Sequence, residues 1–261
     1  MGAIWTITKR EFKDLITSPI AYVALGILTL IGGVHFLLTL ENFDMILKRA
    51  EMQAQFAQDQ DMFSKINLNE MLIGQVVSFA FFLFLFLIPV ITAGSIADEK
   101  KQGTYELLFT SPIRIADIII GKLLASYGFF LVIMATHGMF LMVMFLYGNP
   151  EIGPVVSAYL GLALFGILIL SLGIFASSLT TNYVVAYLIS VALGLSLMIV
   201  GWASRVASGN LSKFLEQAAI DTHFQSFNKG MITLSGIVYF LTAAIFFLVG
   251  TNVSLQSVTR K

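Results

Sequence analysis

The chain has 261 residues, of which 57% are hydrophobic and only 11% are charged, whereas an ordinary soluble domain has about 25% charged residues. Several apolar runs exceed the roughly 20 residues that cross a bilayer, so the composition predicts a polytopic membrane protein and excludes a sizeable soluble domain. The 15 basic residues balance 15 acidic ones, which gives no reason to expect nucleic-acid binding, and the absence of cysteine excludes disulfides and thiol chemistry.

Residues 1–19 have the pattern of an amphipathic helix. Apolar side chains share one face with Thr8, and most of the charges lie on the other. The first face comprises Ile4, Trp5, Thr8, Phe12, Leu15 and Ile16, and the second comprises Lys9, Arg10, Lys13 and Asp14. Such a helix is expected to lie in the membrane surface, although an ordinary charged flank would also fit the pattern.

Six hydrophobic segments follow. The predicted spans cover residues 20–40, 72–93, 118–147, 155–177, 183–203 and 232–251. The fourth and fifth come from one uncharged stretch, Ile152–Ser204, which is too long for a single crossing and contains the turn-like sequence Ser177–Asn182. Unpaired backbone groups are not tolerated in lipid, and the alternating pattern of a β-barrel is missing, so the spans are expected to be helices. The predicted fold is an all-α polytopic membrane protein, with residues 1–261 forming one transmembrane domain.

The distribution of basic residues predicts the orientation. Lysine and arginine are more frequent in the termini and in 94–117 than in 41–71 and 204–231. Lys122, at the start of the third span, is counted with 94–117. Both termini and 94–117 are therefore expected to face the cytosol, and the other two segments to be extracytoplasmic. Within those two segments, 43–57 and 211–218 have apolar residues at helical spacing. They are expected to rest on the outer leaflet or to present a docking surface to a partner.

The segment between the second and third spans, 94–117, is longer and more charged than a connector requires. Gly103 permits a bend, Thr104 can cap a short helix, and Glu106 lies in the first turn of that helix, near the positive end of its dipole. Ser111 and Pro112 then interrupt the helix before the third span. The sequence therefore predicts a folded, amphipathic helix in this loop, where a protein outside the membrane can push.

The pattern E-x-x-x-G-T-x-E-L-L-x-T-S-P, from Glu99 to Pro112 and followed by Gly121–Lys122, resembles the cytosolic loop of type-2 ABC exporter permeases. The resemblance implies six spans, an N-terminal interfacial helix, and a coupling helix that docks on a cytosolic ABC ATPase subunit. The implied ATPase-coupling residues are Glu99, Gly103, Thr104, Tyr105, Glu106, Leu107, Leu108, Ser111 and Pro112. Glu99 and Glu106 are expected to pair with basic groups of the ATPase, and Gly103 is expected to need a positive φ.

A second stretch, His223–Leu241, is similar to the outer segment and last span of the gliding-motility-associated (Gld-type) permeases. This resemblance implies a multi-pass protein of the bacterial cytoplasmic (inner) membrane. It also implies a second permease half, which is either another copy of this chain or a Gld-type co-subunit with an extracytoplasmic domain.

The chain lacks an ATP-hydrolysing motif of its own. Gly121–Lys122 is followed by leucine and has no glycine five residues earlier, so it is not a phosphate-binding Walker A loop. ATP and magnesium are therefore expected on the partner ATPase, present in two copies, and this chain is expected to bind no cofactor or metal. His35 and His137 lie within spans without acidic or histidine neighbours at helical spacing, which favours hydrogen-bonded packing over a metal or proton site.

Two spans contain candidate pathway and packing residues. In the second span, Phe79, Phe82 and Phe86 either line a central path or face lipid. In the fifth span, Ala186, Ser190 and Gly194 repeat at the four-residue spacing that permits close helix packing, either between subunits or within the chain. An aromatic interior without charges suits an apolar or amphipathic cargo better than a small ion.

Two functions remain open from the sequence. The first is the non-catalytic permease subunit of an ATP-driven exporter. The second is a mechanochemical membrane complex that uses the ABC architecture to act on an extracytoplasmic partner and moves no solute.

Overall fold

The computed structural model describes residues 2–57, 67–104 and 113–259, and every element assigned within them is helical. In chain order the elements are α1 Gly2–Thr17, α2 Pro19–Ala57, η2 Asn69–Ile73, α3 Gly74–Thr92, α4 Gly94–Lys101, α6 Ile115–Tyr147, α7 Ile152–Ser178, α8 Tyr183–Val206, α9 Asn210–Ala218, α10 Ile220–Asn228 and α11 Leu234–Thr259. Six stretches of the described residues are long and apolar enough to cross a membrane, which confirms the predicted fold class.

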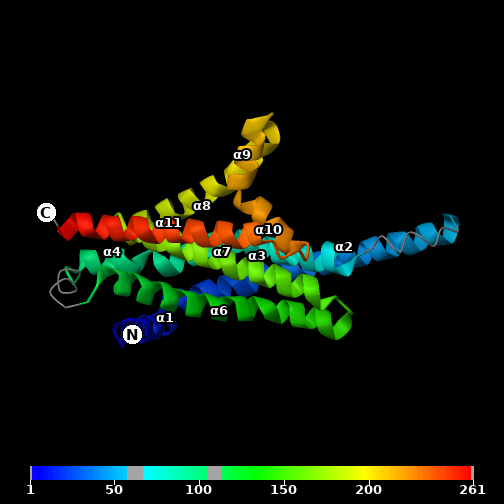
Figure 1. The fold of residues 1–261 in the computed structure, drawn as a ribbon. Helices are drawn as coiled ribbons and strands as arrows, with labels where there is room; N and C mark the ends of the chain where they lie inside the picture. The colour runs from blue at the N-terminus through cyan, green and yellow to red at the C-terminus, as the bar shows by residue number, and fades with distance from the viewer. Residues whose placement is uncertain (1, 58–66, 105–112, 260–261) are drawn as a thin grey trace.

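The spanning helices run side by side (Figure 1), and α7 lies at their centre, in contact with α3, α6, α8, α10 and α11. Large aromatic side chains fill the space around it, and Phe84, Phe130 and Phe165 are fully buried. Glycines in α7 admit these rings, since a methyl group at Gly166 would collide with the ring of Phe130. The core therefore depends on large side chains that face small ones.

The two ends of the bundle differ, and we name them by the helices found there. The "α1 end" holds α1, α4 and the last turn of α11, whereas the "α9 end" holds η2, α9 and α10 (Figure 1). At the α1 end, α7 continues to Ser178, and the expected turn before α8 is confined to residues 179–182. The side chain of Asn182 caps α8 by accepting hydrogen bonds from the backbone N–H groups of Val184 and Val185.

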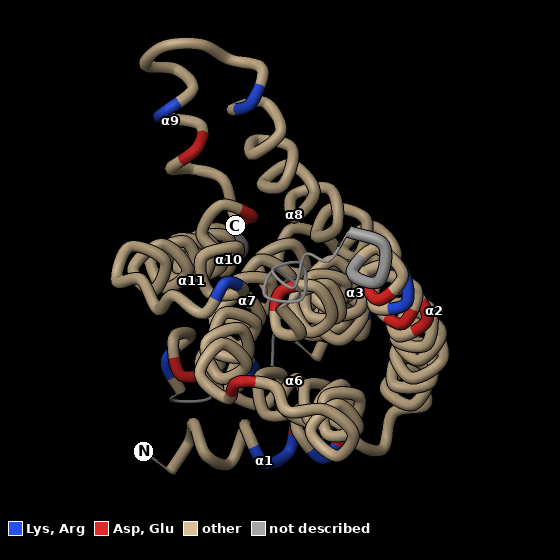
Figure 2. Tube along the Cα trace, turned by 90° about the vertical axis from the view of Figure 1, so that its right-hand side faces the viewer, with Lys and Arg blue, Asp and Glu red and all other residues tan. Residues whose placement is uncertain are grey.

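Helix α1 lies across the bundle rather than along it. In Figure 2, where the spans are viewed from the α9 end, α1 extends sideways beneath α6. Its half-buried face includes Ile7 and Glu11 as well as the expected Phe12 and Leu15, because this face packs on α6. Trp5, expected on the same face, is 69% exposed and points away from the protein.

Helix α2 differs from the expected short span. It continues without a break for 39 residues, a length of about 58 Å, and projects beyond the bundle at the α9 end (Figure 1). The outer half, 43–57, was expected to rest on the outer leaflet or to present a docking surface to a partner. It extends the helix of the first span along its own direction, so the loss of hydrophobicity after Leu40 does not end the helix.

Candidate functional site

Helices α3 and α4 follow one another with only Ala93 between them, and α4 leads toward the expected coupling loop. We use the word kink for this junction, where a side chain of α7 interrupts the backbone hydrogen bonds of the helix. At the kink, the hydroxyl of Ser177 on α7 accepts hydrogen bonds from the backbone N–H groups of Ile96, at 3.0 Å, and Ala97, at 2.9 Å. It also donates to the carbonyl oxygen of Ala93, at 2.7 Å. A side chain inserted into the backbone ladder in this way is a recognised cause of helix kinks. The kink is therefore fixed by α7.

A buried lysine joins three helices just beyond the kink. Lys122 of α6 is only 2% exposed, and its Nζ lies 2.9 Å from Oε1 of Glu11 on α1 and 2.8 Å from Oε1 of Glu99 on α4. Nη2 of Arg10 lies 3.0 Å from the same oxygen of Glu11 and 3.7 Å from that of Glu99. The hydrogen bond to Glu11 raises the pKa of the Arg10 guanidinium above its usual value. We call Arg10, Glu11, Glu99 and Lys122 the Lys122 cluster.

The cluster balances two cations against two carboxylates, whose side chains are 18% accessible, along the wall of a smaller pocket at the α1 end. An ion buried without its partner costs several kcal/mol, so separating α4 or α6 leaves an uncompensated charge, whereas α1 takes both Arg10 and Glu11 with it. Arg10 is more exposed than the other three, with 60% of its side chain accessible, and it contributes less. The cluster therefore holds α1, α4 and α6 together through Glu11, Glu99 and Lys122.

The contact between α1 and α6 also depends on a glycine. A Cβ atom at Gly121 would come within 2.7 Å of the Cγ2 atom of Ile7, so a larger residue would push the two helices apart. At the same place the hydroxyl of Thr8 donates a hydrogen bond to the carbonyl oxygen of Gly121, at 3.2 Å. Gly121 and Lys122 thus act together, the first through close approach and the second through charge.

Two further contacts tie this region to neighbouring helices. Nζ of Lys100 on α4 donates a hydrogen bond to the carbonyl oxygen of Ser178 at the end of α7. The hydroxyl of Tyr183, the first residue of α8, donates to the carbonyl oxygen of Val90 near the kink, at 2.7 Å. As a result, α4 and the kink that precedes it are connected to α1, α6, α7 and α8.

The expected coupling residues fall partly inside this arrangement. Glu99 is not a free surface carboxylate awaiting a base on another protein, because α4 turns it inward to Lys122 and Arg10. Gly103 has a φ of 70°, the left-handed conformation that was expected there. The hydroxyl of Thr104 donates back to the carbonyl oxygen of Glu99, at 3.3 Å. The other expected coupling residues lie outside the described residues: Tyr105, Glu106, Leu107, Leu108, Ser111 and Pro112.

The phenylalanines of the second span divide between two faces of α3. Phe81 and Phe84 are buried in the core, where they contact Phe165 and Phe130. Three others face away from α7: Phe79 and Phe86 are half-buried, and Phe82 is 45% exposed and packs edge-on against Phe86, with their ring centroids 5.1 Å apart. The three candidate pathway residues therefore form one stripe along the least covered face of an otherwise buried helix.

The small residues of the fifth span face inward. Ala186, Ser190 and Gly194 are all buried within this single chain. A methyl group at Gly194 would touch Leu85 of α3 and Ile169 of α7. Of the two roles left open by the sequence, the structure therefore places these residues in packing within the chain.

The two histidines within spans have different surroundings. Nδ1 of His137 lies 2.8 Å from the hydroxyl of Tyr159 in a buried hydrogen bond. The ring of His35 stacks on Phe79, with centroids 3.8 Å apart, at the edge of a polar pocket. Among the residues that the structure describes, no group of three histidine or acidic side chains is placed to hold a metal ion.

Sequence reasoning missed the partners of Glu99. Lys122 was treated as a surface cation of the positive-inside pattern, and Ser177 as part of a turn. The available signal for Lys122 was a single lysine between apolar residues, inside the third predicted span. For Glu11 the signal was a carboxylate on the helix face that carries Thr8 and Leu15.

The chain was compared with known proteins. The family model described as ABC-2 family transporter protein matches residues 5–251, which is nearly the whole chain. No curated protein matched the chain.

Proposed function

The chain belongs to the ABC-2 transporter family and is a permease subunit of an ABC transporter, and we propose that a separate ATPase subunit moves it by docking on the segment after α4. The observation that carries this proposal is the Lys122 cluster. A helix that leads from the second span toward the expected docking loop is joined there to the interfacial helix and to the third span. A simple connector needs no such attachment.

The α1 end is the cytosolic side in this proposal. It holds α1 with Lys9, Arg10 and Lys13, and the end of α4 with Lys100 and Lys101, in keeping with the positive-inside rule. The membrane is then the bacterial cytoplasmic membrane, with both termini in the cytosol. Since the sequence contains no cysteine, single cysteines at exposed positions test this orientation: one at Gln217 reacts with an impermeant reagent from outside, and one at Gln102 does not.

The ATPase is a different polypeptide, and it binds ATP and magnesium. Two such subunits serve two permease halves, because ATP-binding-cassette ATPases act as pairs in the transporters that the sequence resembles. Movement of the docked ATPase displaces α4. The Lys122 cluster passes this displacement to α1 and α6, Ser177 passes it to α7, and the bond from Tyr183 to Val90 passes it to α8.

The stripe of Phe79, Phe82 and Phe86 on α3 is the surface along which cargo moves. It carries no charge and is the least covered face of the second span. Aromatic side chains on such a surface favour an apolar or amphipathic molecule over a small ion.

A mechanochemical complex is the second candidate function. It is favoured by the extension of α2 past the bundle and by α9, which has no buried residues and exposes Leu211 and Phe214. Both features suit contact with an extracytoplasmic domain, such as that of a Gld-type co-subunit. ATPase activity that a lipid cargo stimulates in liposomes supports the exporter, whereas stimulation by a partner protein alone supports the mechanochemical complex.

The docking proposal is tested by Leu108→Asp in the full chain, affinity-purified from its native membrane. A charge in place of a leucine that the docked ATPase would bury removes roughly 1.5–3 kcal/mol of apolar contact and adds an unpaired ion, so the ATPase subunit is expected to be lost from the purified complex. Gln102→Asp, which adds the same charge at an exposed position just before the loop, is the control and keeps the ATPase. A Leu108→Asp complex with a full complement of ATPase would contradict the proposal.

A further inference from the structure

The α9 end contains a large polar pocket that the coupling mechanism does not use. Its volume is about 720 Å³, within the range of small-molecule sites. It lies between α2, the start of α3 and α10, with Pro154 of α7 on a further side. His35, on its wall, is about 16 residues after Pro19 at the other end of α2, or roughly 24 Å along the helix, so the pocket lies at the depth of the far leaflet.

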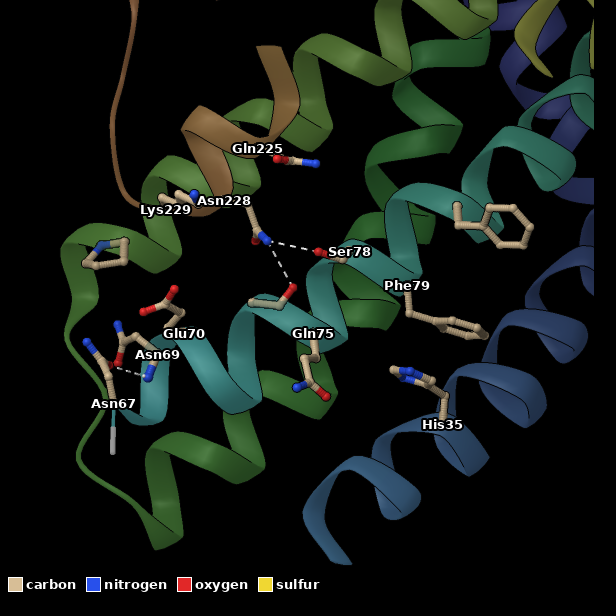
Figure 3. A pocket seen from close by; sticks show the side chains of 13 residues that line it. His35, Asn67, Asn69, Glu70, Gln75, Ser78, Phe79, Gln225, Asn228 and Lys229 are labelled. Carbon is tan, nitrogen blue, oxygen red and sulfur yellow. Dashed lines mark hydrogen bonds between the residues drawn. The ribbon is translucent and has the colours of Figure 1, made fainter. Parts of the chain in front are cut away.

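The lining divides into a polar end and an aromatic end (Figure 3). Asn67, Asn69, Glu70 and Lys229 lie together at the first end, and His35 and Phe79 lie at the other. Gln75, Ser78 and Asn228 lie between them. The pocket is thus itself amphipathic, and among the described residues its lining carries one acid, Glu70, and one base, Lys229.

Some polar atoms of the lining already have partners, and others do not. Nδ2 of Asn228 donates to the carbonyl oxygen of Gly74, at 3.0 Å, and to the hydroxyl of Ser78, at 2.9 Å. By contrast, Oδ1 of Asn228 and Nδ1 of His35 are buried and have no hydrogen-bond partner among the described residues. Both atoms have almost no accessible surface, so they lie in the wall behind the pocket. The groups that a bound molecule can reach are the exposed side chains of Glu70, Gln75 and Lys229.

The charges and the stacked rings define the class of molecule. An ammonium group suits Glu70, a phosphate suits Lys229, and amide and hydroxyl side chains between them satisfy the remaining donors and acceptors. The apolar part of the same molecule then lies on Phe79 and Phe82 and continues along α3 toward Phe86. The aromatic stripe and the polar pocket are therefore consecutive parts of one surface.

We propose that this pocket binds the zwitterionic head group of a phospholipid of the phosphatidylethanolamine type, with its acyl chains on Phe79 and Phe82. Binding itself follows from the pocket alone, whereas the identification of this lipid as cargo rests on the proposed function.

The test uses the full chain, affinity-purified with its associated subunits and placed in lipid nanodiscs, without nucleotide. The probe is a phosphatidylethanolamine that carries a photoreactive diazirine and an alkyne tag, and the readout is labelling of peptides from α3 and α10. Unlabelled phosphatidylethanolamine is expected to compete, and phosphatidylglycerol, which lacks the ammonium group, is expected to compete at least about tenfold less well, as the loss of a charged hydrogen bond implies.

The double variant Glu70→Gln with Lys229→Gln is expected to reduce labelling about tenfold. Both side chains are exposed at the pocket, so the fold is retained. The matched control is Lys213→Gln with Glu216→Gln, which removes the same two charges from α9, outside the pocket, and leaves labelling unchanged. Gln75→Leu, also exposed, lowers labelling without any change of charge.

Equal competition by the two lipids, or unchanged labelling of the Glu70/Lys229 variant, would show nonspecific lipid contact and overturn the inference. The ATPase content of the same preparation is measured separately. Loss of the ATPase with intact labelling contradicts the proposed function alone, whereas an intact complex without selective labelling contradicts this inference alone.

Discussion

The two ends of the bundle use polar residues in opposite ways. At the α1 end, charges are brought inside and paired with one another, as Lys122 is with Glu11 and Glu99. At the α9 end, exposed polar side chains line an open pocket of about 720 Å³, among them the amides of Asn67 and Gln75 and the charged groups of Glu70 and Lys229. Paired charges hold helices in fixed relation, whereas exposed polar groups around a pocket can bind a ligand. This contrast supports our two proposals, that the α1 end transmits force and that the α9 end binds a ligand.

Removal of the central cation should have the largest effect on the α1 end. Lys122→Met leaves Glu11 and Glu99 with only the exposed guanidinium of Arg10 beside them, and breaking a buried ion pair in this way costs up to about 3–5 kcal/mol. The midpoint of thermal unfolding in detergent is expected to fall well below that of the wild type. Lys101→Met, at an exposed position at the end of α4, is the control and should leave the midpoint nearly unchanged. Equal unfolding midpoints for the two variants would show that the Lys122 cluster does not stabilise the fold.

Ser177→Ala tests the kink between α3 and α4. The substitution leaves the N–H groups of Ile96 and Ala97 without an acceptor, at a cost of about 1–3 kcal/mol for an unsatisfied buried group. We expect a smaller loss of stability than for Lys122→Met and a larger loss of coupling between ATP hydrolysis and transport. Ser257→Ala, on an exposed turn of α11, is the matched control. If Ser177→Ala kept the wild-type ratio of transport to ATP hydrolysis, the contact of Ser177 with α4 would have no part in coupling.

The smallest effect is expected at the glycine contact. Gly121→Ala introduces a methyl group that overpacks against Ile7 by about 1–3 kcal/mol, partly offset by the roughly 1 kcal/mol that alanine gains over glycine in a helix. A net destabilisation of about 1 kcal/mol is therefore expected from unfolding midpoints. Gly26→Ala on α2 has open space around it and should be neutral or stabilising. Stabilisation by both substitutions would show that α1 is loosely attached to α6.

The sequence predicted the spans better than it predicted the contacts between them. Six crossings follow from hydrophobicity alone, because the membrane imposes the length of each apolar run. The unbroken length of α2 was not predicted, since the polarity after Leu40 does not end the helix. The face of α1 was assigned to lipid, although Ile7 and Glu11 pack on α6.

The Lys122 cluster could not be derived from sequence spacing. Its members come from three helices, and Lys122 is separated from Glu11 by 111 positions and from Glu99 by 23. Only the crossing of α1 beneath α6 and the helical continuation of α4 beyond the kink bring them together. The positive φ of Gly103, by contrast, was expected from the local sequence, because a bend at one residue depends on that residue's own conformational freedom.

The central claim is that the Lys122 cluster carries movement from the ATPase-docking loop to the far side of the bundle. The most direct measurement is the distance between spin labels on cysteines introduced at Ile152 and Val206, two exposed positions at the α9 end. It is recorded in the assembled complex with and without ATP trapped on the ATPase, in the wild type and in Lys122→Gln. The account predicts that trapped ATP changes this distance in the wild type and leaves it unchanged in Lys122→Gln complexes that retain the ATPase. A full ATP-dependent change in that variant would contradict the account.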